Sequence, residues 1–449
     1  MPSSRLSNFA SSDWGRALTW LARLIVGGTF VFSGFVKAVD PWGTLYKMEE
    51  YVAALGVPAT HSLIVAGVFG LCALEFMLGV FLIAGCYRRS TPVVTLAVMA
   101  VMLPLTLWIA VSDPVKDCGC FGDAVVISNW ATFWKNVVLT LLTVWLVRFN
   151  ARAVTLISPA FQWLAVVVSI AFTGYVSCIG YMRQPLLDFR PYAVGGPITD
   201  DSDSEEGAYR FVYEKDGVRK EYGEQDELPS EEDGWKFVER RQTSGDEKAG
   251  DDTGRTFRIW SEDGEDDVTD DVIDSDRMLM LLIPELESVS PATTWKINSL
   301  YDWSEKMGVD MLAVVSAGPD RIAEWKDLSM PRYNIFTSDD TAIKEVARGN
   351  PALVYLDNDT VRWKSTLSAL DTDRITSSDD PQAIMEPVVD GRREATNCIM
   401  LFFAALVTLV AVSMVPRIRN AFGTARRRRA RAASESEPAK RDDKAPRAE

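Results

Sequence analysis

The chain has 449 residues, 47% of them hydrophobic, and a formal net charge of −15. The length allows two or three domains. The acidic balance argues against nucleic acid as a partner of the main body of the chain. The charge is segregated, because residues 200–275 hold 27 acidic and 10 basic side chains, whereas the end of the chain after Pro416 is basic.

Six apolar runs are long enough to cross a membrane, which takes about 20 residues of helix. They are residues 17–38, 60–84, 91–112, 130–148, 158–181 and 397–415. The first run is too long for a cleaved signal peptide, and further spans follow it. We therefore predict an integral membrane protein whose immediate partner is the lipid bilayer.

Basic residues indicate the orientation, because Lys and Arg gather on the cytoplasmic side of membrane proteins. They occur before the first helix, after the second, after the fourth and after the sixth: Arg5, Arg16, Arg88, Arg89, Arg148, Arg152 and Arg426–Arg429. Both termini are then cytoplasmic, and residues 182–396 are external. For a bacterium this predicts a multi-pass protein of the inner (cytoplasmic) membrane that faces the oxidising periplasm.

The long external segment reads as two parts. In the acidic part, residues 209–222 predict a hairpin around Lys215-Asp216-Gly217, and residues 235–242 and 256–266 predict further strands. From residue 277, strands and helices alternate and end in a hairpin around residues 357–359. This order predicts an α/β fold with a mixed sheet.

The predicted organisation has six parts. They are a cytoplasmic leader (1–16), a five-helix membrane domain (17–181), an acidic β-rich or linker region (182–276), an α/β domain (277–396), a sixth transmembrane helix (397–415) and a basic cytoplasmic tail (416–449). We interpret the tail as an anchor, with a lipid or nucleic-acid patch as the alternative.

The order of elements in residues 277–396, with Asn350-Pro351 just before the closing hairpin, resembles the thioredoxin fold. In that family a cis-proline precedes the strand beside the active site. Since proline is the only residue for which a cis bond is cheap, we predict that Pro351 is cis. Where the family carries Cys-x-x-Cys, residues 284–295 read PELESVSPATTW. The resemblance therefore implies a thioredoxin-like domain without the redox motif, with a peptide or partner site beside Pro351.

Three stretches of the membrane region resemble the DoxX/MauE family of small helical bundles. They are Leu21–Pro41, Ala73–Gly85 and the Cys-Gly-Cys-Phe-Gly run at Cys118–Gly122, which is the most specific. The fusion to an external domain resembles DoxX-family proteins of Bacteroidetes, so the resemblance covers most of the chain. It implies sulfur redox chemistry at a membrane: maturation of a disulfide-rich periplasmic protein, or thiosulfate–quinone chemistry. A quinone is the one cofactor that it suggests.

Cys118 and Cys120 are the candidate catalytic residues. Two cysteines one glycine apart can be bridged only in a tight, strained turn, and strained disulfides exchange readily. Redox exchange, a structural bridge and a metal or other role remain the alternatives. We expect no metal site, because the chain has a single histidine. Cys178 and Cys398, near the external ends of the fifth and sixth helices, are candidate resolving cysteines.

Charged residues within the membrane are costly and usually paired or functional. Arg23 and Glu75 lie at depths that differ by about 6 Å at 1.5 Å per residue, so we predict that they pair. Lys37, near the external end of the first helix, is expected to extend outward, with Asp40 or the acids of the Cys118–Asp123 loop as candidate partners.

Two functions follow from these features. In the first, the loop at Cys118 and Cys120 passes disulfides or electrons between periplasmic thiols and a membrane acceptor, as part of a thiol–disulfide oxidoreductase system. In the second, the protein is a non-catalytic assembly factor whose external domain holds a periplasmic client. A transporter is a third alternative, although no pair of broken helices supports it.

Overall fold

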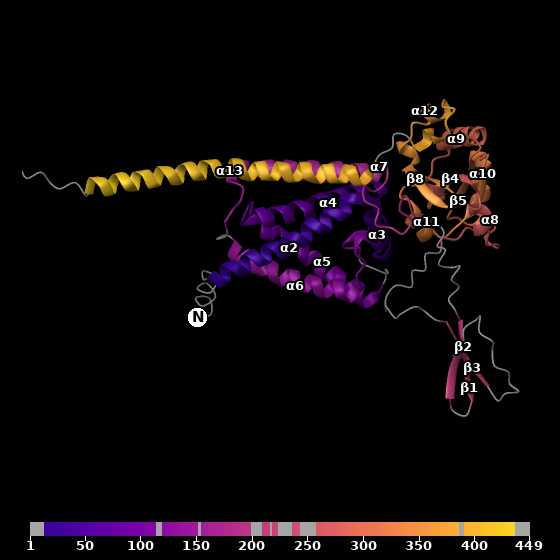
Figure 1. Ribbon diagram of the computed structural model, residues 1–449, viewed down its shortest axis with the longest axis horizontal. Helices are drawn as coiled ribbons and strands as arrows, with labels where there is room; N and C mark the ends of the chain where they lie inside the picture. Colours follow the sequence, from indigo (N-terminus) through magenta and orange to yellow (C-terminus); the bar gives the residue numbers. More distant parts are fainter. Residues whose placement is uncertain are drawn as a thin grey trace, which may run out of the picture. The chain divides into compact units, whose positions relative to one another are not determined.

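The structure is a computed structural model that describes residues 13–113, 119–150, 154–198, 209–215, 218–222, 236–242, 257–385 and 390–435. In residues 209–242 and 417–435 the description is of the backbone alone. The chain divides into two compact units, which are described separately below (Figure 1). One unit comprises Met1–Leu187 and Val389–Glu449, and the other comprises Asp188–Val388.

The first unit is a helical bundle. Six helices in its described part are long and apolar enough to cross a membrane: α2 (Asp13–Val39), α4 (His61–Ala84), α5 (Ser90–Ser112), α6 (Asn129–Phe149), α7 (Gln162–Met182) and α13 (Gly391–Glu435) as far as Pro416. The short 3-10 helices η1 (Gly122–Ala124) and η3 (Pro159–Phe161) precede α6 and α7. The six predicted apolar runs coincide with these helices, although α2 and α13 begin earlier than predicted.

A seventh helix, α3 (Pro41–Ala54), was not predicted, since it is too short to span a membrane. Its start carries ordinary helix signals. The carboxylate of Asp40 accepts a hydrogen bond from the backbone nitrogen of Gly43 at 3.0 Å, and Pro41 occupies the first turn. The helix places Met48 and Tyr51 beside the loop between α5 and α6.

Helices α2 and α4 pack most closely, because glycines line their contact. A Cβ atom at Gly34 would lie 2.4 Å from the backbone nitrogen of Phe76, and one at Gly79 would lie 2.5 Å from the backbone nitrogen of Val31. Small residues at helix contacts allow backbones to approach within a membrane. These glycines therefore fix the register in which the polar side chains of α2 and α4 meet.

Helix α13 lies along α7 (Figure 1). The Tyr175 hydroxyl donates a hydrogen bond to Glu394 at 2.9 Å near one end, and the backbone nitrogen of Ser158 donates to the Ser413 hydroxyl at 3.0 Å near the other. Between them the ring of Phe402 packs on other aromatic rings of the bundle. The last apolar helix is thus part of the bundle, although the other five helices precede it by more than two hundred residues.

The second unit is built on a five-stranded mixed sheet with the order β6-β5-β4-β7-β8. The strands are β4 (Arg277–Ile283), β5 (Asp310–Val315), β6 (Asn334–Thr337), β7 (Ala352–Asp357) and β8 (Thr360–Thr366). Strands β4, β5 and β6 are parallel, whereas β7 is antiparallel to both β4 and β8. The predicted α/β arrangement with a closing hairpin is present.

Helices cover both faces of this sheet. One face carries α9 (Thr294–Met307), α10 (Pro319–Ser329), α12 (Thr372–Thr376) and the 3-10 helix η9 (Pro381–Met385). The other carries α8 (Thr269–Ile273) and α11 (Asp340–Val346). Short 3-10 turns complete the unit: η6 (Leu286–Ser288), η7 (Pro291–Thr293) and η8 (Leu367–Ala369). Every residue of β4 except the first is buried, as expected for the central strand of a covered sheet.

The sequence before β4 contributes more to this unit than we predicted. Tyr192, Ile198, Phe257, Ile259 and Ile273 are buried in the same core as the sheet, instead of forming a separate region or linker. The strand predicted over residues 256–266 is absent, and only isolated bridges form there, from Trp260 to Asp267 and Thr337. The chain turns tightly directly after Trp260, where the backbone nitrogen of Gly264 donates to the carbonyl of Ser261 at 2.9 Å and Gly264 has a φ angle of +77°.

A separate three-stranded antiparallel sheet has the order β2-β1-β3. It consists of β1 (Tyr209–Lys215), β2 (Val218–Tyr222) and β3 (Lys236–Gln242). The predicted hairpin and the strand after it are both confirmed by the pairing of β1 with β2 and β3.

Candidate functional site

The loop that carries the paired cysteines leaves α5 and returns to α6. Cys118 lies outside the described residues, whereas Cys120 is described and partly buried. Gly119 and Gly122 have φ angles of +60° and +51°, and the backbone nitrogen of Gly122 donates to the carbonyl of Gly119 at 3.1 Å. Glycine adopts these left-handed angles without steric cost, so the sequence Cys-Gly-Cys-Phe-Gly produces a tight turn here.

The turn is held against α2 and α6. The Phe121 ring packs edge-on against Phe32 with 5.3 Å between ring centroids, and the Lys135 ammonium lies over the Phe121 ring, 3.9 Å from its centroid. A Cβ atom at Gly122 would lie 3.2 Å from the Val36 side chain. Phe121 and Gly122 therefore pack closely on the bundle.

A buried ion pair lies directly beneath this turn. The Lys37 ammonium of α2 donates to both carboxylate oxygens of Glu75 in α4, at 2.9 and 2.7 Å, and to the Ser33 hydroxyl at 3.0 Å. Ser33 lies 2.8 Å from the Glu75 carboxylate and 2.7 Å from the carbonyl oxygen of Cys120. The lysine and glutamate side chains are only 5% and 6% exposed. One serine thus connects the cysteine turn to a buried charge pair.

These residues surround a small cavity of about 40 Å³. It is lined by Thr29, Phe30, Ser33, Lys37, Glu75, Val98, Met99, Met102, Cys120, Phe121, Lys135, Asn136 and Leu139. The cavity can hold water-sized molecules. Pockets that bind drug-sized ligands typically measure about 300–1,000 Å³, so this cavity is too small to hold a quinone.

The predicted pairing of Arg23 with Glu75 is wrong. The Arg23 guanidinium instead donates to the carbonyl oxygens of Leu82 at 2.7 Å, Ile83 at 2.9 Å and Val154 at 3.2 Å. Two of these carbonyls belong to the last turn of α4, where helical carbonyls have no partner within the helix. Arg23 is therefore a structural cap on α4.

The expectation that Lys37 extends outward is also wrong, since it turns inward to Glu75. Glu75 of α4 lies opposite Ser33 of α2. Ser33 is ten residues after Arg23, which is roughly 15 Å along the helix. Counting residues from the ends of the apolar runs could not reveal that Glu75 pairs with Lys37. The close contacts at Gly34 and Gly79 set a register in which the ends of α2 and α4 are not aligned. The signal that could have found the pair is the spacing of Ser33 and Lys37, one helical turn apart on the face that carries Gly34.

The other cysteines lie elsewhere in the bundle. Cys178 of α7 and Cys398 of α13 are unbridged thiols, and neither lines the cavity beside Cys120. Cys72 and Cys86 are fully buried. The structure therefore does not bring the two candidate resolving cysteines to Cys120.

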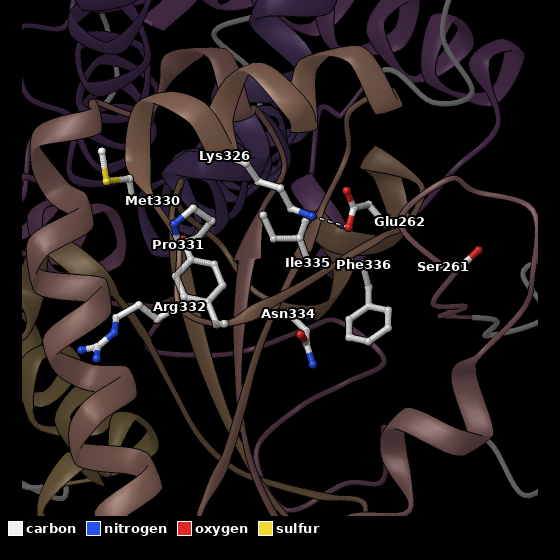
Figure 2. A pocket seen from close by; sticks show the side chains of 10 residues that line it. Ser261, Glu262, Lys326, Met330, Pro331, Arg332, Asn334, Ile335 and Phe336 are labelled. Carbon is white, nitrogen blue, oxygen red and sulfur yellow. Dashed lines mark hydrogen bonds and ion pairs between the residues drawn. The ribbon is translucent and has the colours of Figure 1, made fainter.

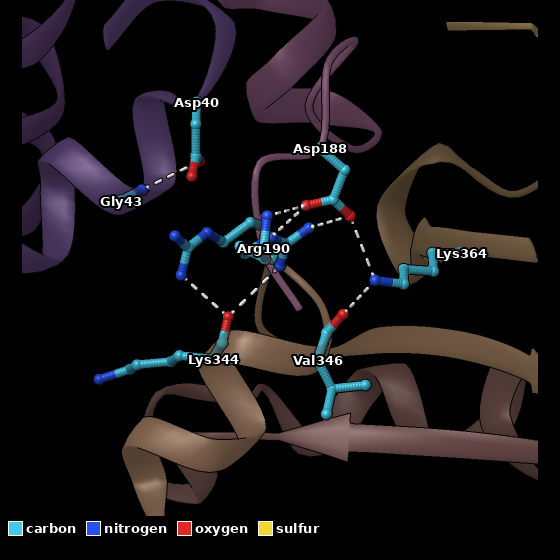
Figure 3. Close-up of polar contacts among 8 residues, drawn as sticks. Asp40, Gly43, Asp188, Arg190, Lys344, Val346 and Lys364 are labelled. Carbon is cyan, nitrogen blue, oxygen red and sulfur yellow. Dashed lines mark hydrogen bonds and ion pairs between the residues drawn. The ribbon is translucent and has the colours of Figure 1, made fainter. Parts of the chain in front are cut away.

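The α/β unit has its own buried charged cluster (Figure 3). Asp188 accepts hydrogen bonds from Arg190 at 2.7 and 3.0 Å and from the Lys364 ammonium at 3.2 Å. Lys364 also donates to the carbonyl of Val346, and Arg190 to that of Lys344. The Arg190 guanidinium is the main charge that holds the pKa of Asp188 below its usual value, while burial lowers the pKa of Lys364 to about 7.

Near this cluster, the predicted cis-proline is confirmed, because the Asn350-Pro351 bond is cis. The Asn350 side chain donates to the carbonyl of Glu285 at 2.8 Å and to the Ser288 hydroxyl at 2.5 Å. It thus ties Pro351 to the segment after β4. The segment after β4, where the thioredoxin family carries its Cys-x-x-Cys motif, contains no cysteine in this sequence. Here it is held to Asn350 by hydrogen bonds.

A cavity of about 590 Å³ in the α/β unit lies beside the edge strand β6 (Figure 2). Residues 330–336 form one wall, and an ion pair between Lys326 and Glu262 crosses it. The two charged side chains are 40% and 46% exposed. The cavity is therefore an open surface feature whose ion pair is exposed, although the buried Tyr333 is among its lining residues.

Comparison with known proteins supports part of the resemblance. Residues 15–149 match the family described as methylamine utilisation protein MauE, and residues 207–244 match a domain of unknown function (DUF8463). No curated protein and no solved structure matches the chain significantly. The MauE match is narrower than expected, since it ends with α6 and leaves out α7, the α/β unit and α13. The second match covers the small sheet β1–β3. Residues 15–149 thus form a MauE-like bundle of apolar helices, to which the cysteine turn and the Lys37–Glu75 pair both belong.

Proposed function

We propose that this protein relays disulfides at the external face of a bacterial cytoplasmic membrane, through the cysteines of the loop between α5 and α6. The main support is the position of Cys120: its carbonyl is bonded to Ser33, which also bonds the buried Lys37–Glu75 pair. Desolvated charges are expensive in a membrane and usually have a function. A charge pair beside a cysteine is suited to thiol chemistry, because the thiolate is the reactive form.

The relay consists of two thiol–disulfide exchanges. A thiolate of a periplasmic client protein attacks a Cys118–Cys120 disulfide, forming a mixed disulfide and releasing the other loop cysteine as a thiolate. The client's second thiolate then breaks the mixed disulfide, so the client gains a disulfide and both loop cysteines are reduced. A disulfide-bearing partner protein regenerates the loop by the reverse exchange and leaves as a dithiol. One disulfide enters and one leaves, so electrons and protons balance.

The external orientation is part of this proposal. It rests on the arginines and lysines that flank the predicted cytoplasmic ends of the helices. It places Cys118, Cys120 and the α/β unit in the periplasm, where disulfides persist.

The test is to trap mixed disulfides with Cys118→Ser and Cys120→Ser in the native membrane. We expect one of the two variants to accumulate a covalent adduct that disappears on reduction, because its remaining thiol has no neighbour to resolve the intermediate. Cys178→Ser is the matched control, since it removes an unbridged thiol from α7, and it should trap nothing. The relay is excluded if neither loop variant traps a partner and both retain wild-type function.

One observation favours a second function, a non-catalytic assembly factor. None of the six cysteines falls within residues 188–388, so the α/β unit has no thiol with which to exchange. We propose that this unit is a thioredoxin-like domain without Cys-x-x-Cys. Its sheet order and the cis bond before β7 support this, and its role would be to hold a client. If the double variant Cys118→Ser/Cys120→Ser keeps its client and its function, the assembly role replaces the relay.

A further inference from the structure

We propose that the buried Lys37–Glu75 pair controls how readily Cys120 forms a thiolate: the Lys37 ammonium stabilises the sulfur anion, and Glu75 limits that stabilisation. This inference rests on the proposed relay and assigns two further residues to it. Both act through Cys120 and not on a client, so they are tuning residues of the thiol.

The first step is the position of the thiol relative to the pair. Cys120, Lys37 and Glu75 line the same small cavity. Ser33 holds the Cys120 backbone at 2.7 Å, so the turn cannot move away from the ion pair without breaking this bond. The fold therefore fixes the position of the Cys120 backbone relative to the charge pair.

The second step is the balance of charge around the thiol. From α2 the turn faces Lys37, and from α4 it faces Glu75, with Cys72 behind them. Lys47 of α3 lies beside Gly119, Lys135 of α6 lies over Phe121, and Asp123 follows in the loop itself. The part of α5 that lines the cavity is apolar: Val98, Met99 and Met102. Of these charges, only Lys37 and Glu75 are shielded from solvent to within a few per cent.

The third step is the direction of the effect. Charges interact more strongly where water is excluded, so the pair acts on the sulfur more strongly than the exposed lysines do. A nearby cation favours the thiolate and a nearby carboxylate opposes it. Removing Lys37 must then make the thiolate harder to form, whereas neutralising Glu75 must make it easier. A purely structural pair would not produce opposite shifts.

The experiment measures alkylation of Cys120 against pH. In a Cys118→Ser background, the reduced protein in detergent is treated with iodoacetamide from pH 6 to 10, and the Cys120 peptide is quantified by mass spectrometry. We expect Lys37→Met to move the midpoint of the rate profile up by about one pH unit, a roughly tenfold slower reaction at pH 7. Glu75→Gln should move the midpoint down, and Lys37→Arg, which keeps the charge, should restore the wild-type profile.

Arg23→Met is the matched control, because it removes another buried cation from α2, whose hydrogen bonds go to the carbonyls described above and whose guanidinium lies over the Trp20 ring. Its Cys120 profile should match the parent protein. If Lys37→Met does not reach the membrane, Glu75→Gln decides alone. An unchanged or higher midpoint in Glu75→Gln, or shifts in the same direction for both variants, overturns the inference. The readout involves no client, so it can fail while mixed-disulfide trapping succeeds, and the reverse also holds.

Discussion

The bundle and the α/β unit each bury a charged cluster, and the two clusters are built differently. In the bundle, Lys37 and Glu75 bond each other and Ser33 beside a cavity that a cysteine also lines. In the α/β unit, Lys364 and Arg190 bond Asp188 and also backbone carbonyls. The first cluster borders a water-sized cavity that Cys120 also lines, whereas the second joins separate chain segments. The comparison indicates that burial alone does not distinguish a functional site from a structural ion pair. A cavity beside the buried charges is the feature that does.

The largest expected effect comes from breaking the pair in the bundle. Glu75→Leu leaves the Lys37 ammonium buried without its carboxylate, which should cost about 3–5 kcal/mol of folding free energy. The double variant Lys37→Met/Glu75→Leu should recover most of this loss. Thermal unfolding in detergent measures both effects. If Glu75→Leu is as stable as the parent protein, the pair is not the buried contact described here.

The next effect concerns the helix contact that aligns the pair. Gly34→Ala places a methyl group against the backbone of α4, so we expect a loss of about 3 kcal/mol or more. Gly28→Ala, on the same helix but with nothing within 4 Å, is the control and should be neutral or slightly stabilising. Equal effects of the two substitutions in the same unfolding assay would contradict the close packing of α2 and α4.

The cluster of Asp188, Arg190 and Lys364 should make the stability of the α/β unit depend on pH. The pKa of Lys364 is about 7 in the folded protein against 10.5 for an ordinary lysine, so the unfolded chain binds more protons between these values. The free energy of unfolding should then rise with pH in this window, by up to about 1.4 kcal/mol per pH unit. The check is to measure hydrogen-exchange rates of peptides from β7 and β8 at each pH, in the parent protein and in Lys364→Met. The prediction fails if the ratio of the exchange rates of the two proteins is independent of pH.

The smallest effect is expected at the open cavity beside β6. Its ion pair between Lys326 and Glu262 is substantially exposed. Exposed pairs contribute at most about 1 kcal/mol, so Lys326→Ala should change the same exchange-derived stability by less than this. A larger loss would show that this surface is a more organised site than its exposure indicates.

The sequence was sufficient for the long helices of the bundle and for the strands of both sheets, although it also predicted a strand over residues 256–266 that does not form. Length and apolarity located the six long helices, and alternating patterns with turn residues located the five-stranded sheet and the hairpin of β1 and β2. Helix α3 was missed because it is short and partly polar. The cis bond at Pro351 was predicted from the resemblance to the thioredoxin fold, together with the low cost of a cis bond before proline.

The site was only partly predictable. Cys120 is marked by an unusual motif, but its neighbours depend on which faces of α2 and α4 meet. Residue counting along apolar runs paired Glu75 with Arg23, because it assumed that the ends of the helices align. The contact at Gly34 and Gly79 sets a different register, and this depends on backbone packing that the apolar pattern does not encode.

The most direct test of the relay is the state of the cysteines in intact cells. A membrane-impermeant maleimide is added before and after mild reduction, and labelling at each cysteine is quantified by mass spectrometry, with an added Ser377→Cys in the α/β unit as the external reference. The account predicts that Cys118 and Cys120 gain label on reduction, while the buried Cys72 and Cys86 do not. It is contradicted if Ser377→Cys is labelled but the two loop cysteines react neither before nor after reduction.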